Sequence, residues 1–338
     1  MARSQLNRGL VGTISSAALR LEQLAVDEYV EAVLPHSASL WAGQRTFERY
    51  AGDLRTFASS GYGRRRFKLL GLRVDGTIAS SCKGYERELR CGERILRATG
   101  IGAVFTRESF RGQGLATALL AAILDTQRAA GTDVVYLFSD IRPHFYEEIG
   151  FEKLPSRIFT LRADALESAR VEVTAIEDRD WPGLARCFST LEARRPFALR
   201  RTPLVWEMIR ARHTIAPATG SIANLAIRSR DRILAYCLGT REVQADAYVV
   251  DEFGFAGDAH RALVGPLLRA AAGDLRKITG WLPPPVARGA LPRGTVRARR
   301  DAILMIAPLS ATARTRWKAE KTDILRETAD MVWSTDHV

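Results

Sequence analysis

A short glycine-containing segment, Arg111-Gly112-Gln113-Gly114-Leu115-Ala116, is the part of the chain that points most clearly to ligand chemistry. It follows an apolar run, Ile101 to Thr106, that predicts a strand, and it precedes apolar residues spaced as one face of a helix. Glycines leave backbone N–H groups uncovered where a helix begins, and the unpaired donors and the helix dipole favour an anion there. The segment is therefore expected to hold a pyrophosphate. Its glycine spacing is not G-x-G-x-x-G, and no Lys-Ser or Lys-Thr follows as in a P-loop.

A second candidate follows the next β-like run, Val134 to Phe138. The chain continues as Ser139-Asp140-Ile141-Arg142-Pro143 and then as His144-Phe145-Tyr146-Glu147-Glu148-Ile149-Gly150-Phe151. On the residues alone, Tyr146 would fill the core beside Phe145 with its hydroxyl hydrogen-bonded.

Together these features resemble the GNAT superfamily of N-acetyltransferases. The glycine segment is similar to the R-x-x-G-x-A signature that binds the pyrophosphate of acetyl-CoA, and the Tyr146 segment is similar to the F-Y-x-x-x-G-F element that carries the usual general acid. The resemblance implies that acetyl-CoA is the cosubstrate. It also implies that a primary amine, on a small molecule or on a lysine, attacks acetyl-CoA directly without an acyl-enzyme.

The resemblance also assigns roles along the chain. Backbone groups of Val104, Phe105 and Thr106 would pair with the pantetheine arm, and one of their N–H groups would stabilise the oxyanion. The Arg111 side chain would add a charge-assisted contact to the pyrophosphate, and Tyr146 would protonate the departing sulfur. The backbone N–H groups expected to bind the pyrophosphate are those of Gly112, Gln113, Gly114, Leu115, Ala116 and Thr117.

The general base is open at this stage. Many GNAT enzymes use a Glu on the strand before the loop, but here that strand is Arg97-Ala98-Thr99-Gly100-Ile101-Gly102-Ala103-Val104. Asp140 is the leading side-chain candidate; the alternative is that it caps the helix that carries Tyr146. Some tandem GNAT proteins of the enhanced-intracellular-survival type place the terminal carboxylate in the site as a base. Val338 is the matching residue here, with plain packing of the tail as the alternative.

The order of elements predicts an α/β fold (an α+β mixed sheet) with two GNAT-like domains in tandem. We expect a catalytic domain at 1–163, a degenerate domain at 170–315 and a tail, 316–338, packed on the body. The segment Leu225 to Gly239 repeats Leu70 to Gly84 without a gap. The shared residues are Arg73 and Arg228, Ile78 and Ile233, Cys82 and Cys237, and Gly84 and Gly239.

The second copy has lost the phosphate loop, because the chain there is Gly257-Asp258-Ala259-His260-Arg261. Only one glycine remains, and the Asp258 carboxylate would repel a pyrophosphate. We therefore expect the second domain to bind no CoA, and to complete the core or to shape the acceptor cleft.

Composition limits which partners, metals and locations are expected. The net charge of +12 over 338 residues favours polyanionic CoA as a partner, but the basic clusters lack interleaved aromatic residues, so we do not expect nucleic-acid binding. No apolar run is long enough to span a membrane. No C-x-x-C pair occurs among the four cysteines, Cys82, Cys91, Cys187 and Cys237. We therefore expect no metal site, and we expect the protein to be in the reducing cytoplasm. The alternative function is that of a non-catalytic CoA-binding regulator or scaffold; the acceptor and the oligomeric state are not determined.

Overall fold

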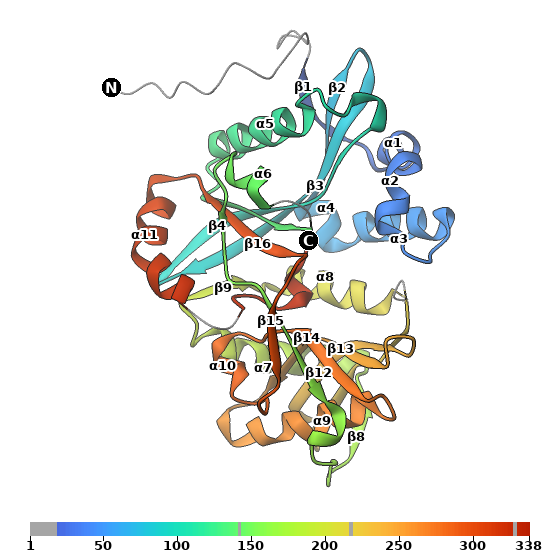
Figure 1. The fold of residues 1–338 in the computed structure, drawn as a ribbon, viewed down its shortest axis with the longest axis vertical. Helices are drawn as coiled ribbons and strands as arrows, with labels where there is room; N and C mark the ends of the chain where they lie inside the picture. Colours follow the sequence, from blue (N-terminus) through green and yellow to red (C-terminus); the bar gives the residue numbers. More distant parts are fainter. Residues whose placement is uncertain (1–18, 141–142, 216–218, 327–329) are drawn as a thin grey trace.

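Two eight-stranded mixed sheets organise the protein (Figure 1). The computed structural model describes residues 19–140, 143–215, 219–326 and 330–338. One sheet and its helices make the upper half of the molecule in Figure 1, and the second sheet makes the lower half. The expected fold, two mixed α/β domains in tandem, is confirmed.

The first sheet has the order β1-β2-β3-β4-β5-β16-β6, with β9 paired to β3. Strands β4 and β5 are parallel, and the other pairs are antiparallel. Its strands are β1 (Arg20–Leu24), β2 (Phe67–Val74), β3 (Thr77–Cys91), β4 (Arg94–Thr106), β5 (Val134–Ser139), β6 (Glu152–Lys153), β9 (Phe197–Arg200) and β16 (Ile303–Pro308).

Helices cover both faces of the first sheet. Helix α5 buries Leu115, Leu119 and Ile123, four residues apart, so one apolar stripe packs on one face of the sheet. The other face carries aromatic residues of the N-terminal helices, including Tyr50 and Tyr62. The helices of this half are α1 (Val26–Ala32), α2 (Leu34–Trp41), α3 (Phe47–Ser59), α4 (Gly61–Arg66), α5 (Leu115–Ala129) and α6 (Pro143–Glu147).

The second sheet has the order β15-β7-β14-β13-β12-β11-β8, with β10 paired to β12. Its strands are β7 (Arg157–Arg162), β8 (Val173–Ala175), β10 (Ser221–Ile222), β11 (Leu225–Ser229), β12 (Arg232–Glu242), β13 (Ala247–Phe255), β14 (Lys277–Trp281) and β15 (Thr295–Ala298). The helices after β7 are α7 (Trp181–Glu192), α8 (Pro203–Thr214), α9 (Val264–Ala272), α10 (Pro285–Arg288) and α11 (Ala311–Arg326).

The internal repeat seen in the sequence is also a repeat of strand register. In the β2–β3 hairpin Leu70 lies opposite Cys82, and in the β11–β12 hairpin Leu225 lies opposite Cys237. Both hairpins shift register at the equivalent place, immediately before Arg73 and Arg228 respectively. Because a bulge changes which residues face the core, its recurrence at equivalent positions supports duplication of the hairpin.

The two sheets exchange strands. β7 lies within the predicted first domain, 1–163, but pairs with β14 and β15 of the second sheet. β16 comes from the C-terminal part of the chain but lies between β5 and β6 of the first sheet. Each sheet is therefore completed by a strand from the other side of the boundary expected between 1–163 and 170–315. The position of that boundary stays a prediction.

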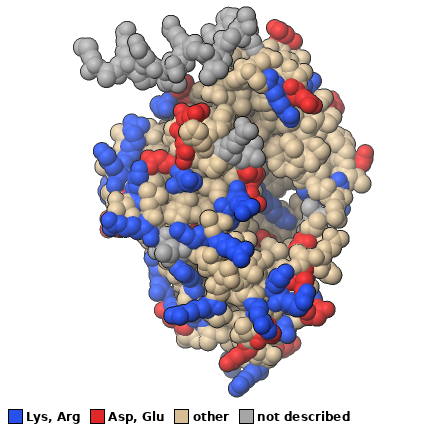
Figure 2. All heavy atoms as spheres, viewed as in Figure 1, with Lys and Arg blue, Asp and Glu red and all other residues tan. Residues whose placement is uncertain are grey.

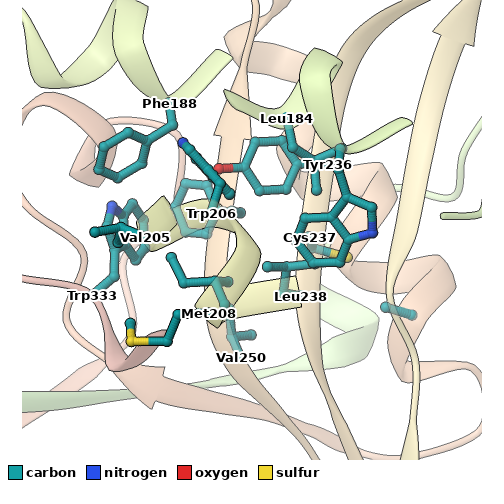
Figure 3. Close-up of a cluster of buried hydrophobic side chains, with 14 of the residues drawn as sticks. Leu184, Phe188, Val205, Trp206, Met208, Tyr236, Cys237, Leu238, Val250 and Trp333 are labelled. Carbon is teal, nitrogen blue, oxygen red and sulfur yellow. The ribbon is translucent and has the colours of Figure 1, made fainter. Parts of the chain in front are cut away.

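The last nine residues, 330–338, form what we call the C-terminal strap. Asp336 of the strap accepts hydrogen bonds from Arg87 of β3 at 2.9 Å and from Arg201 at 3.2 and 3.1 Å, and these side chains are at most 1% exposed. Arg201 also binds Glu252 of β13 at 2.9 Å. Trp333 packs among buried side chains of α7, α8 and the second sheet (Figure 3). The strap is thus fixed to both halves of the molecule.

Candidate functional site

The glycine segment forms a left-handed loop directly before α5. Gly112 has φ 77° and Gly114 has φ 73°, a region that residues with a side chain rarely adopt. Gly114 is the N-cap of α5, and a Cβ at Gly112 would meet no atom within 4 Å. The side chains of Arg111 and Gln113 are exposed beside it. The loop therefore presents an open backbone surface to solvent.

This loop places free backbone donors at one point. The first bond of α5 runs from the Ala118 N–H to the Gly114 carbonyl at 3.0 Å, so the N–H groups of Gly114, Leu115, Ala116 and Thr117 have no partner within the helix. The first turn of α5 contains no acidic residue. Donors and dipole together make this a suitable site for a pyrophosphate.

Strands β4 and β5 separate next to this loop. Their parallel pairing ends at Ile101 and Leu137. Ala103 then has φ 50°, and β4 shifts register against β3 between Ser81 and Lys83. In the following residues of β4, Phe105 and Thr106 pair with β3, and the parallel pairing with β5 includes none of Val104 to Thr106, so their other edge is open toward the gap between the strands. These are the three residues expected to contact the pantetheine arm.

Tyr146 lies on the α5 side of this gap. Its side chain is 9% exposed and packs with Phe145 and Phe151, whose ring centroids lie 5.0 and 6.1 Å away. Burial, followed by the nearby Asp140 carboxylate, raises the pKa of Tyr146 to about 12, so the hydroxyl keeps its proton at neutral pH. Among the described residues the hydroxyl has no hydrogen-bond partner. The ring fills the core as expected, while the hydroxyl remains available to a ligand.

Asp140 follows β5 on the other side of the gap. One of its oxygens accepts the Ala302 N–H at 3.1 Å, which connects it to the start of β16. Desolvation raises the pKa of Asp140 above its usual range, and Asp301 adds to this. Residues 141–142, through which it would cap α6, lie outside the described residues.

The terminal residue Val338 lies against β4. A Cβ at Gly102 would be 2.6 Å from the carboxyl carbon of Val338, and one at Gly100 would be 3.0 Å from its Cγ2. A Cβ at Gly102 would collide with the strap backbone, and one at Gly100 would first meet the Tyr136 ring at 2.7 Å, so the two glycines permit the close packing here. The terminal carboxyl group thereby lies against β4, the strand before the glycine loop. Two glycines on one face of β4 were the signal in the sequence for this approach.

A cavity of about 390 Å³ opens where the two halves meet, next to Val338 and Asp140. Figure 2 shows this face of the molecule hollowed between its upper and lower halves. The walls come from α2, α3, α8, both sheets and the strap. Sequence reasoning did not identify its other polar and aromatic residues, which are Trp41, Tyr50, Lys83, Tyr85, Phe138, Arg212, His213, Asp251, Ser334 and His337.

Burial suppresses the charge of several of these groups. Desolvation lowers the pKa of His337 and of His213 to about 4, so both imidazoles are neutral at pH 7. Burial raises the pKa of Asp251 to about 6, although Ser334 donates a hydrogen bond to it at 3.0 Å. At pH 7 Asp251 is still mainly ionised, so the charges at the cavity are those of Lys83, Arg212, Asp140, Asp251 and the terminal carboxylate.

The equivalent loop of the second domain is occupied by protein side chains. Asp258 begins a 3-10 turn after β13 and pairs with Arg194 at 3.0 Å and with Arg261 at 2.6 Å. A carboxylate at this helix start takes the place that an anionic ligand would need.

Two observations concern membranes and metals. In the part of the chain that the structure describes, no helix is long and apolar enough to cross a membrane. No group of three metal-ligating side chains occurs among the described residues, and all four cysteines are buried free thiols.

Comparisons with known proteins bear on the fold. Residues 25–154 match the family model described as an acetyltransferase (GNAT) domain. No curated protein matches the chain. The GCN5-related N-acetyltransferase from Anabaena variabilis superposes with a TM-score of 0.70 at 15% identity, over 87% of this chain and 74% of that chain. The corresponding protein from Kribbella flavida gives 0.65 at 19%, over 87% and 73%.

N-myristoyltransferase from Saccharomyces cerevisiae, solved with bound myristoyl-CoA, superposes with a TM-score of 0.55 at 10% identity, over 89% of this chain and 81% of that chain. At these identities the likeness establishes the fold. The chain is thus a GNAT-fold protein with two GNAT-like domains in tandem.

Proposed function

We propose that the protein transfers an acetyl group from acetyl-CoA to a primary amine. The observation that carries the proposal is the gap between β4 and β5, which has the anion-binding loop at one end, Tyr146 on one side and Val338 on the other. The pyrophosphate would sit on the backbone from Gly112 to Thr117, and the thioester would lie in the gap beside Val104 to Thr106.

The residues on the two sides would act in sequence. The Val338 carboxylate would accept a proton from the acceptor ammonium, either directly or through water, and Asp140 is the second candidate for this step. The free amine would then attack the thioester carbon, and a backbone N–H of β4 would stabilise the oxyanion. When the C–S bond breaks, Tyr146 would give its proton to the leaving thiolate, and the proton that the attacking nitrogen then loses would return to the tyrosinate through water. Because base and acid lie on opposite sides of the gap, no acyl-enzyme is needed.

The experiment is thiol release from acetyl-CoA over a panel of primary amines and lysine peptides, with the wild type and Tyr146→Phe in parallel. We expect turnover with at least one amine class and a loss of about 10²–10⁴-fold in Tyr146→Phe, the usual range for a general acid. The affinity for acetyl-CoA should persist in the variant. Tyr248→Phe, which removes a hydroxyl in the second sheet, is the matched control and should keep full turnover.

Two outcomes would contradict the proposal. Full turnover in Tyr146→Phe would remove the general-acid role. Tight binding of acetyl-CoA by the wild type without turnover on any amine would favour the non-catalytic alternative. Repeating the panel with longer acyl-CoA thioesters measures the acyl preference. We also propose a cytoplasmic location, because the four thiols are unpaired.

A further inference from the structure

Lys83 is a buried cation in the wall of the cavity. It is 9% exposed, and its ammonium donates to the Tyr50 hydroxyl at 3.3 Å and lies 5.5 and 6.0 Å from the ring centroids of Tyr50 and Tyr29. Lysine has three N–H donors, and only this one hydrogen bond engages them among the described residues. No carboxylate forms an ion pair with Lys83 in the described part of the chain.

Such an arrangement is unfavourable without a ligand. A buried ammonium requires an anionic partner, because aromatic faces and one hydroxyl replace only part of its hydration. Desolvation lowers the pKa of Lys83 to about 8, and the neighbouring Arg212 and Arg45 add to the effect. The cavity therefore contains a cation whose charge the protein itself does not neutralise.

The charges of the cavity are separated in space. Lys83 extends from β3 toward Tyr50 of α3. Arg212 of α8 lies 5.4 Å from the ring centroid of Tyr85 and donates a hydrogen bond to the His337 carbonyl, so it lies next to the terminal residue. The carboxylates of Val338 and Asp140 lie at the gap between β4 and β5. The Lys83 ammonium is therefore the charge on the α3 side, and Arg212 lies with the carboxylates at the point of transfer.

Register sets the distance between these two ends. Lys83 lies directly opposite Gly102 across the antiparallel β3–β4 pair, so both face the cavity. Opposed Cβ positions are about 5 Å apart, and the Val338 carboxyl carbon lies over Gly102. The lysine stem then carries the ammonium away from β4 toward Tyr50. This separation suits one small molecule with an amine at one end and an anion at the other.

We propose that the acceptor is a small amine that also carries a carboxylate, such as an amino acid, with the carboxylate on Lys83 and the amine at the gap between β4 and β5. The inference rests on the proposed function and specifies its substrate class. The one ammonium beside Tyr50 matches the single charge of a carboxylate better than the double charge of a phosphate. The aromatic walls, Trp41, Tyr85 and Phe138, favour an apolar body between the two charges.

The test compares amines that differ only in the carboxylate. Thiol release from acetyl-CoA is measured with phenylalanine and phenethylamine, and with leucine and isoamylamine, for the wild type, Lys83→Met and Lys83→Arg. We expect the wild type to prefer the carboxylate-bearing member by at least about tenfold in kcat/KM. Lys83→Met should reduce this ratio to near one, and Lys83→Arg should restore part of it. Lys318→Met, which removes an exposed lysine of α11, should keep the wild-type ratio.

The outcomes separate this inference from the proposed function. Turnover with equal kcat/KM for both members of each pair, or a ratio unaffected by Lys83→Met, would overturn the inference and leave the acetyltransferase intact. If no amine reacts, titration with 3-phenylpropionate tests the anion site alone. Binding to the wild type but not to Lys83→Met would support the site. Binding to neither, or to both equally, would overturn it.

Discussion

At the residue scale, the site depends on glycines at positions where a side chain would interfere. Gly112 and Gly114 expose donors before α5, while Gly100 and Gly102 admit the terminal residue to β4. The first pair is a local requirement of a left-handed turn, and the second is a requirement of close approach by a distant segment. Glycine therefore has two different functions within one short stretch of chain.

Replacing Gly114 with Val tests the loop. A β-branched residue at φ 73° costs about 1–2 kcal/mol in place, so the loop will change conformation, and we expect the Kd for acetyl-CoA to rise by about tenfold or more. Titration calorimetry gives the Kd, and circular dichroism checks the fold. Gly76→Val is the control, because Gly76 has φ 78° in a hairpin turn between β2 and β3 and should leave the affinity unchanged. Equal effects of the two variants would refute the loop assignment.

Deleting Val338 alone tests the terminal carboxylate. The deletion withdraws the carboxylate by one residue, about 3.5 Å, while the ion pairs of Asp336 remain. We expect kcat to fall by about 10–100-fold with little change in the Kd for acetyl-CoA. Val338→Ala is the matched control, since it keeps the carboxylate and loses only methyl groups. If the deletion variant retains wild-type kcat, Asp140 becomes the remaining candidate for the base.

Residues with local requirements could be predicted from the sequence, and residues that depend on long-range packing could not. The loop from Gly112 to Gly114 follows from spacing and backbone preference, and it is found at the start of α5. Lys83 gave no such signal, because its burial requires α3 to pack over β3. The cavity charges depend likewise on the strap and α8, which lie far from β3 in sequence.

Single elements can be predicted where apolar pattern and turn residues agree. Asp75-Gly76 is a two-residue turn of the Asp-Gly type, and it separates β2 from β3. Helix α4 has no such signal, since it is Gly-Tyr-Gly-Arg-Arg-Arg and owes its start to a Ser60 cap rather than to apolar periodicity. The pairing of β16 with β5 has no local signature at all.

The strap holds a buried carboxyl group that should make stability depend on pH. Asp330 is 1% exposed and accepts the Arg157 N–H, with Arg299 at 3.3 Å. Burial nevertheless raises the pKa of Asp330 to about 7. Between about pH 4 and 7 the folded state therefore holds a proton that the unfolded state has lost, so this group makes stability fall as pH rises through that range.

Asp330→Asn should remove this dependence. The amide does not ionise, so relative to the wild type the variant should gain on the order of 2–3 kcal/mol in free energy of unfolding between pH 5 and 8. Urea unfolding at several pH values measures the difference. Asp323→Asn, at an exposed position of α11, should show a difference that is constant with pH. A constant difference for Asp330→Asn as well would show that the carboxyl titrates normally.

The exchange of β7 and β16 connects the two halves at the scale of the whole molecule. Met305 of β16 is fully buried in the core beneath α5, and without β16 the strand β5 would present an open edge. β9 adds a further pairing with β3, and Asp336 joins Arg87 of the first sheet to Arg201. Neither half should therefore be stable without the other, although each has its own sheet.

We expect the whole chain to unfold in one transition. Hydrogen exchange measured by mass spectrometry on peptides from β11 to β13 reports on the second half. The same measurement on peptides from β2 to β5 reports on the first half. The two probes should give the same urea midpoint, because unfolding of either sheet removes a strand from the other. A fragment of residues 1–163, which lacks β16, should show no cooperative transition. Separate midpoints, or a fragment that folds alone, would mean that the exchanged strands contribute little and that the halves are independent domains.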